Sequence, residues 1–149
     1  MNTEWTMVLR LLLAAALGGV IGFQREWTGK EAGLRTHMLI CLGSALITVI
    51  SMVGFPGDVP GRVAAGIVTG IGFIGAGVIL HRTGGEVVGL TTAATIWAAA
   101  AIGMAAGTGK YIIAVGSCVL TLIILLIPHL HKIFKNRGVN NEDNNHGGI

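Results

Sequence analysis

The side chains best placed for chemistry lie in the polar segment 24–35 and just after it. Arg25 and Glu26 are adjacent there, and Arg35 is followed by Thr36. A guanidinium group binds carboxylates and phosphates through paired hydrogen bonds. Two such groups beside one carboxylate could order the segment, or bind an anionic lipid headgroup or a partner protein. The alternative is that these charges form solvated pairs that anchor the segment at a membrane surface.

A second charged pair stands further along the chain. Asp58 and Arg62 are four residues apart at the start of an apolar stretch. This spacing suits an ion pair along a helix, with the acid nearer the positive N-terminal end. The pair is a candidate functional site, and a structural ion pair is the alternative.

A third group opens the next apolar stretch, where three threonines precede a tryptophan. Thr91, Thr92 and Thr95 are expected to bond a carbonyl one turn back or a neighbouring helix. Thr91 could also cap the helix start. Trp97 lies one turn further in, away from the interface that tryptophan favours, so we expect it to be a packing anchor.

Catalytic and metal-binding patterns are missing from the sequence. It contains no nucleophile–base pair, no paired carboxylates and no His/Cys spacing typical of a metal site. Magnesium prefers oxygen ligands with one or two carboxylates, yet no Asp or Glu lies inside an apolar stretch. We therefore predict that the protein is not an enzyme and holds no cofactor or metal, and that any involvement of Mg²⁺ is indirect.

The composition sets the class of protein. Of 149 residues, 52% are hydrophobic and 11% are charged, the mean hydropathy is +0.75 and 24 residues are glycine. Soluble domains carry about 25% charged residues, so the chain is expected to be an integral membrane protein. A membrane helix needs about 20 mostly apolar residues. The charge-free stretches predict an all-α polytopic bundle of about five spans: 5–23, 36–54, 62–80, 89–107 and 110–128. Residues 129–149 are polar and are expected to form a disordered cytoplasmic tail.

The positive charges predict an orientation. With five spans, one side holds seven Lys and Arg residues and the other holds Arg62 and Lys110. The N-terminus is therefore expected outside and the C-terminus in the cytoplasm. The net charge of +3 is a topology signal, and no soluble basic face suggests nucleic-acid binding. Arg10 lies inside the first span, where it could reach the interface or bond a carbonyl within the bundle.

Glycine spacing predicts how the helices pack. Small residues four apart let membrane helices approach closely, and three such pairs occur: Gly18 and Gly22, Gly66 and Gly70, Gly103 and Gly107. In the third span Gly77 shares the face of Gly66 and Gly70, whereas Gly72 and Gly75 point the opposite way. We therefore expect this span at the centre of the bundle. The string 70–75 also fits G-x-G-x-x-G, but a dinucleotide site needs a preceding strand, so packing explains it better.

Several of these stretches together resemble the MgtC/SapB (YhiD-like) family of bacterial inner-membrane proteins, over about residues 8–115. The resemblance is carried by the segments around Gly18–Gly22, Gln24-Arg25-Glu26, residues 32–37, Gly70–Ile79 and Gly89–Trp97. It implies a five-helix plasma-membrane protein associated with growth in low magnesium and, in some pathogens, with virulence. Many relatives have an acid where this chain has Gln24, and many carry a soluble C-terminal domain.

The residues and the resemblance together predict a non-enzymatic membrane protein that binds or modulates other membrane proteins, or forms homo-oligomers, in ion homeostasis. The alternative is a small transporter or channel for Mg²⁺ or another ion, in which the third span and the threonines would line a path. The lipid bilayer is the other expected partner.

Overall fold

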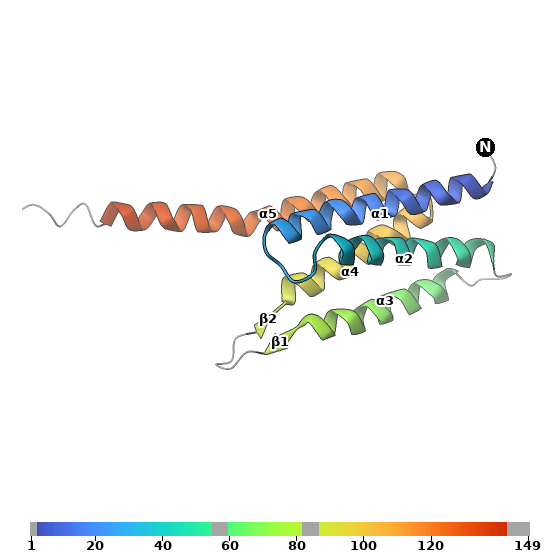
Figure 1. Ribbon diagram of the computed structural model, residues 1–149, viewed down its shortest axis with the longest axis horizontal. Helices are drawn as coiled ribbons and strands as arrows, with labels where there is room; N and C mark the ends of the chain where they lie inside the picture. Colours follow the sequence, from blue (N-terminus) through green and yellow to red (C-terminus); the bar gives the residue numbers. More distant parts are fainter. Residues whose placement is uncertain (1–2, 55–59, 82–86, 143–149) are drawn as a thin grey trace, which may run out of the picture.

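A computed structural model describes residues 3–54, 60–81 and 87–142; for residues 60, 80–81 and 128–142 it describes the backbone alone. The described chain is a bundle of five helices with one short hairpin (Figure 1). In chain order the elements are α1 (Thr3–Trp27), α2 (Leu34–Val53), α3 (Pro60–Val78), β1 (Leu80–His81), β2 (Val87–Val88), α4 (Leu90–Gly107) and α5 (Tyr111–Glu142). The prediction of an all-α polytopic membrane protein is confirmed.

The helices have the length and the composition of membrane spans. Among the described residues, α1, α2, α4 and residues Gly61–Val78 of α3 are long and apolar enough to cross a bilayer. The apolar part of α5, Tyr111–Ile127, is slightly shorter. The helix itself continues to Glu142, past residue 128, where the sequence predicts that a disordered tail begins. Leu130, Ile133 and Phe134 have helical spacing, which favours this continuation; residues 143–149 lie outside the described range.

Helix α2 lies between α1 and α4, and glycines make both contacts close. A Cβ atom added at Gly18 of α1 would meet the carbonyl oxygen of His37 and, at 2.9 Å, the Cβ of Cys41. A Cβ added at Gly103 of α4 would meet the carbonyl oxygen of Cys41 and, at 2.9 Å, its Cα. Helices α1 and α4 therefore both pack closely against Cys41 of α2.

The same two faces continue along the bundle. Gly22 lies against the backbone of Leu34, and Gly107 lies against Ala45. Each of these glycines stands one turn from the first glycine of its pair. The buried core beside them is built largely of small side chains, among them Ala14, Ala99 and Ala106. Such a core allows backbones to approach closely, which is how membrane helices gain van der Waals contact.

Helix α3 lies at the edge of the bundle and not at its centre (Figure 1). Of its glycines, Gly75 packs against Ala93 of α4, whereas a Cβ atom added at Gly66, Gly70, Gly72 or Gly77 would meet no atom of the described residues within 4 Å. Its buried residues with described side chains are Ile67, Ile71 and Gly75. The expectation of a central third span is wrong because a smooth helix face does not reveal whether its neighbour belongs to the same chain.

The hairpin connects α3 to α4 through a turn that requires glycine. Leu80 pairs with Val88 and His81 with Val87 in antiparallel register. Gly89 follows with φ of +91°, and a Cβ there would meet the carbonyl oxygen of Val78. The left-handed backbone and the close approach both exclude a larger residue. Helix α4 therefore starts at a fixed point beside the end of α3.

Arg10 bonds within the bundle. Its Nη1–H donates to the carbonyl oxygen of Gly107 at 3.1 Å, and its Nε–H donates to the Tyr111 hydroxyl at 3.3 Å. The last carbonyls of a helix have no partner inside the helix. Of the two possibilities for Arg10, the structure therefore shows the bond to a carbonyl, which ties α1 to the end of α4.

Candidate functional site

The candidate site is centred on Arg25, in the last turn of α1. This side chain is only 3% exposed, and its Nη2–H donates a 2.7 Å hydrogen bond to Oγ1 of Thr92 in the first turn of α4. Thr95 is also buried, and its hydroxyl donates to the carbonyl oxygen of Thr92 at 2.8 Å. The structure thus brings together two of the three sequence-predicted groups, the arginine segment and the threonines.

Glu26, the neighbour of Arg25, has a separate partner. Its Oε2 accepts a 2.9 Å hydrogen bond from the backbone N–H of Leu34, the first residue of α2. A carboxylate at a helix N-terminus satisfies a free donor and interacts favourably with the helix dipole. A Cβ atom at Gly33 would lie 2.7 Å from the same carboxylate oxygen, so glycine makes room for this contact. Glu26 therefore fixes the entry into α2.

His37 also belongs to this region, and the sequence did not single it out. It is fully buried in the first turns of α2, and its Nδ1 lies 3.0 Å from the carbonyl oxygen of Gly33. With the proton on Nδ1, that nitrogen donates and Nε2 is an acceptor. Within the described part of the chain, His37 Nε2, Arg25 Nε and Gln24 Oε1 are buried without a hydrogen-bond partner. The cluster formed by Gln24, Arg25 and His37 therefore contains polar atoms inside the protein that could still form hydrogen bonds.

The side chains of the other predicted residues are exposed or half-buried. Arg35 is exposed and Thr36 is half-buried at the start of α2. Thr91 is exposed and does not cap α4, because the cap position is Gly89. Trp97 is 52% exposed, so it is not a packing anchor. Small residues of α4, namely Ala99, Gly103 and Ala106, make the close contacts with the neighbouring helices instead.

The remaining charged pair is only partly described. Arg62 is exposed in the first turn of α3. The start of α3 lies at the end of the bundle opposite the C-terminal end of α1 (Figure 1). Asp58 lies outside the described residues, so the expected ion pair stays a prediction. Among the residues that the structure describes, no group of three His, Cys, Asp or Glu side chains could hold a metal ion.

The hydroxyl of Thr92 is expected to stabilise the fold measurably. Thr92→Val keeps the shape of the side chain but leaves the Arg25 guanidinium without its acceptor, which destabilises by ~1–3 kcal/mol. The matched control is Thr91→Val, one residue away and exposed. Thermal unfolding in detergent, followed by circular dichroism, should show a lower Tm for Thr92→Val alone. Equal Tm values for the two variants would remove the hydrogen bond as a stabilising contact.

The fold and the site define a polytopic helical membrane protein whose packed end is organised around a buried arginine. The family model described as "MgtC family" matches residues 11–133. The chain therefore belongs to the MgtC family.

Known relatives are similar over most of this chain. It is 50% identical over 130 residues to YhiD of Escherichia coli strain K12, described as a candidate magnesium transporter, a match that covers 82% of this chain and 60% of YhiD. It is 48% identical over 115 residues to protein MgtC of Salmonella typhimurium strain LT2, covering 77% of this chain and 49% of MgtC. The uncharacterized protein slr0014 of Synechocystis is 42% identical over 121 residues, covering 80% of this chain and 51% of slr0014.

The chain thus spans about half to three fifths of the length of these relatives. No solved structure matches the chain significantly.

Proposed function

We propose that the protein is a non-enzymatic membrane protein that supports magnesium homeostasis by binding other membrane proteins. Its place is the bacterial inner membrane, with the N-terminus outside and the C-terminus in the cytoplasm. Membership of the MgtC family and the magnesium-related description of YhiD support the link to magnesium. The excess of Lys and Arg on one side supports the orientation.

One observation carries the binding role: the glycine pair Gly66 and Gly70 of α3 has no close contact with any other described part of the chain. The pair Gly18 and Gly22, like the pair Gly103 and Gly107, is closed by the backbone of α2. Gly66 and Gly70 have the same spacing, but a Cβ atom added at either would meet none of the residues that the structure describes. Each of the other two glycine pairs therefore serves a close contact between two helices of the chain. The third pair has the same spacing, and in this proposal its close contact is made with a helix of another protein.

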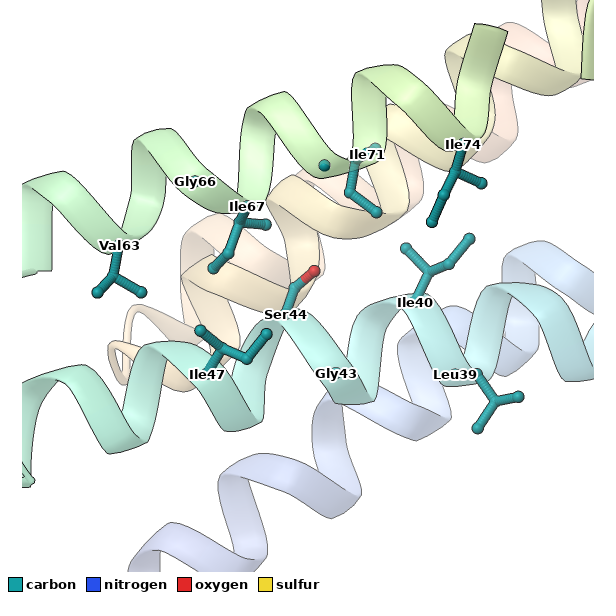
Figure 2. Close-up of a pocket in the computed structure, with 11 residues that line it drawn as sticks. Leu39, Ile40, Gly43, Ser44, Ile47, Val63, Gly66, Ile67, Ile71 and Ile74 are labelled. Atoms are coloured by element: carbon teal, nitrogen blue, oxygen red, sulfur yellow. The ribbon is translucent and has the colours of Figure 1, made fainter. Parts of the chain in front are cut away.

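A groove beside these glycines suits such a helix. It runs between α2 and α3, with a cavity volume of about 660 Å³ (Figure 2). Branched apolar side chains point into it from both helices, including Ile40, Ile67, Ile71 and Ile74 (Figure 2). Ser44 of α2 also lines the groove and adds a hydroxyl group.

The occupant we propose is a transmembrane helix of another membrane protein with small residues on one face. A glycine stripe matters to a partner whose backbone must come close, whereas lipid tails adapt to a surface of any shape. The groove supplies apolar contact, and the stripe supplies the close approach. The protein would then modulate the activity of its partner by binding or releasing one of the partner's transmembrane helices.

The test of this function is the flux of Mg²⁺ through the purified protein. Proteoliposomes containing the protein and a fluorescent Mg²⁺ indicator are compared with protein-free liposomes of the same lipids, under an inward Mg²⁺ gradient. We expect the two rates to be equal, since a modulator moves no ions by itself. Protein-dependent flux would overturn the proposal and support the alternative, a small transporter, which the description of YhiD favours.

A further inference from the structure

A large surface hollow lies next to the buried arginine, at the opposite end of α3 from Arg62. It has a cavity volume of about 1260 Å³ and lies between the end of α1, strand β2, the start of α4 and residues Leu125 and Leu126 of α5. Arg25 and Thr92, which hydrogen-bond to each other, both line it. The proposed binding surface on α2 and α3 shares none of its lining residues.

The inner wall of this hollow is positively polarised. Only 3% of the Arg25 side chain is exposed. Its hydrogen-bond partner is the neutral hydroxyl of Thr92, and its Nε has no hydrogen-bond partner among the described residues. A buried charge is stable only when it is paired or well hydrogen-bonded. A guanidinium group with a free Nε–H offers the geometry that phosphate and carboxylate oxygens fit.

The first turn of α4 adds a second feature to the same wall. The cap residue Gly89 has no side chain that could accept a hydrogen bond from the first N–H groups of α4, and no described side chain caps this helix end. The first internal bond of α4 runs from the N–H of Ala93 to the carbonyl of Gly89, which leaves the earlier N–H groups free of partners within the helix. Leu90, Thr91 and Thr92 line the hollow. A helix N-terminus of this kind favours an anionic group.

The rim of the hollow is amphipathic. Lys30 and Glu31 line it, are both exposed, and offset each other in charge, so that Arg25 determines the net charge of the described lining residues. Apolar side chains stand beside them: Phe23 is 59% exposed, Trp27 82%, Leu90 58% and Leu126 54%. Such surfaces face lipid chains in a membrane protein, and tryptophan is favoured at the level of the headgroups.

We propose that this hollow binds the phosphate of an anionic phospholipid, with Arg25 and the N-terminus of α4 contacting the phosphate and the apolar rim contacting the acyl chains. A free phosphate ion offers the same anionic chemistry but makes no use of the exposed apolar rim. A zwitterionic lipid brings a cation close to Arg25 and Lys30, which lowers its affinity. The bound lipid would hold α1, α4 and α5 together at this end of the bundle.

Quenching of Trp27 fluorescence tests this directly. The full chain with Trp5→Phe and Trp97→Phe keeps Trp27 as its tryptophan at the hollow, and it is titrated in detergent with phospholipids brominated in the acyl chains. We expect brominated phosphatidylglycerol to reach half-maximal quenching at ~10-fold lower concentration than brominated phosphatidylcholine. Arg25→Gln should remove this preference. Lys110→Gln, which deletes one charge at the opposite end of α4, should keep it.

Three results would overturn the proposal. They are equal quenching by the two lipids, an unchanged preference in Arg25→Gln, and relief of the quenching by inorganic phosphate, which would assign the hollow to a free anion. Should Arg25→Gln fail to fold, Arg25→Lys keeps the charge but loses the paired donors, and it should reduce the preference several-fold. The comparisons of the two lipids and of phosphate require no variant at Arg25.

Discussion

Gly103→Ala should destabilise the bundle by about 2 kcal/mol, whereas the same change at Gly72 should leave its stability equal or slightly higher. The new methyl group at position 103 would meet the backbone of Cys41, with its Cα at 2.9 Å. A backbone cannot rotate away as a side chain can, so α4 must move from α2. At Gly72 the same methyl group would meet no described atom within 4 Å.

Two opposing contributions to the free energy of unfolding, helix propensity and overpacking, decide the sign of each effect. Alanine is more favourable than glycine inside a helix by about 1 kcal/mol, and this gain applies at both positions. Overpacking of a tight core destabilises by about 1–3 kcal/mol and occasionally more. The steric term is expected to exceed the gain at Gly103 because the obstructing atoms belong to the main chain. At Gly72 only the gain remains.

Thermal unfolding of both variants in the same detergent measures this difference. Gly18→Ala should behave like Gly103→Ala, since its methyl group would meet the backbone of α2 at His37. If Gly103→Ala and Gly72→Ala unfold at the same temperature, α2 and α4 are not in the close contact described here.

The glycine spacing indicated close packing, but it could not identify the helix that each glycine meets. Gly18 and Gly103 both approach Cys41, a residue that composition alone describes as a small buried side chain. Gly66 has equivalent spacing with Gly70, yet it has no close neighbour in the described part of the chain. The difference depends on how five helices are arranged in space. Hydropathy and spacing therefore predicted the spans and their smooth faces, while the central position of α2 and α4 required the structure.

Arg25 shows a similar limit in the candidate site. From the sequence it belongs to a polar connecting segment, yet α1 continues to Trp27 and buries the guanidinium against α4. A signal was present: Ala14, Gly18, Ile21, Gly22 and Arg25 follow one face of a helix, with spacings of three and four. His37 lacked such a signal, because a polar residue near a helix start is expected at the membrane surface.

The double change Gly66→Leu with Gly70→Leu should abolish function in the cell while leaving the protein folded. A Cβ atom added at either glycine meets no described atom within 4 Å, and both positions line the groove of about 660 Å³, so we expect the bundle to accept leucine there. Leucine also favours the helix more than glycine does. A partner helix, however, could no longer approach α3 closely. In a bacterial strain lacking its own MgtC-family gene, this variant should fail to restore growth in low magnesium.

The matched control is Gly72→Leu, which adds the same side chain to a face of α3 turned away from the glycine pair. It should restore growth fully, and both variants should unfold within a few degrees of the unmodified protein. A photo-crosslinking residue in place of Ile74, which points into the groove, then reports the occupant (Figure 2). An adduct heavier than the chain by the mass of another membrane protein, and lost on Gly66→Leu with Gly70→Leu, is the expected result. An adduct of twice the chain's own mass would assign the groove to a second copy, and growth of the double variant would show that the glycine stripe of α3 serves no partner.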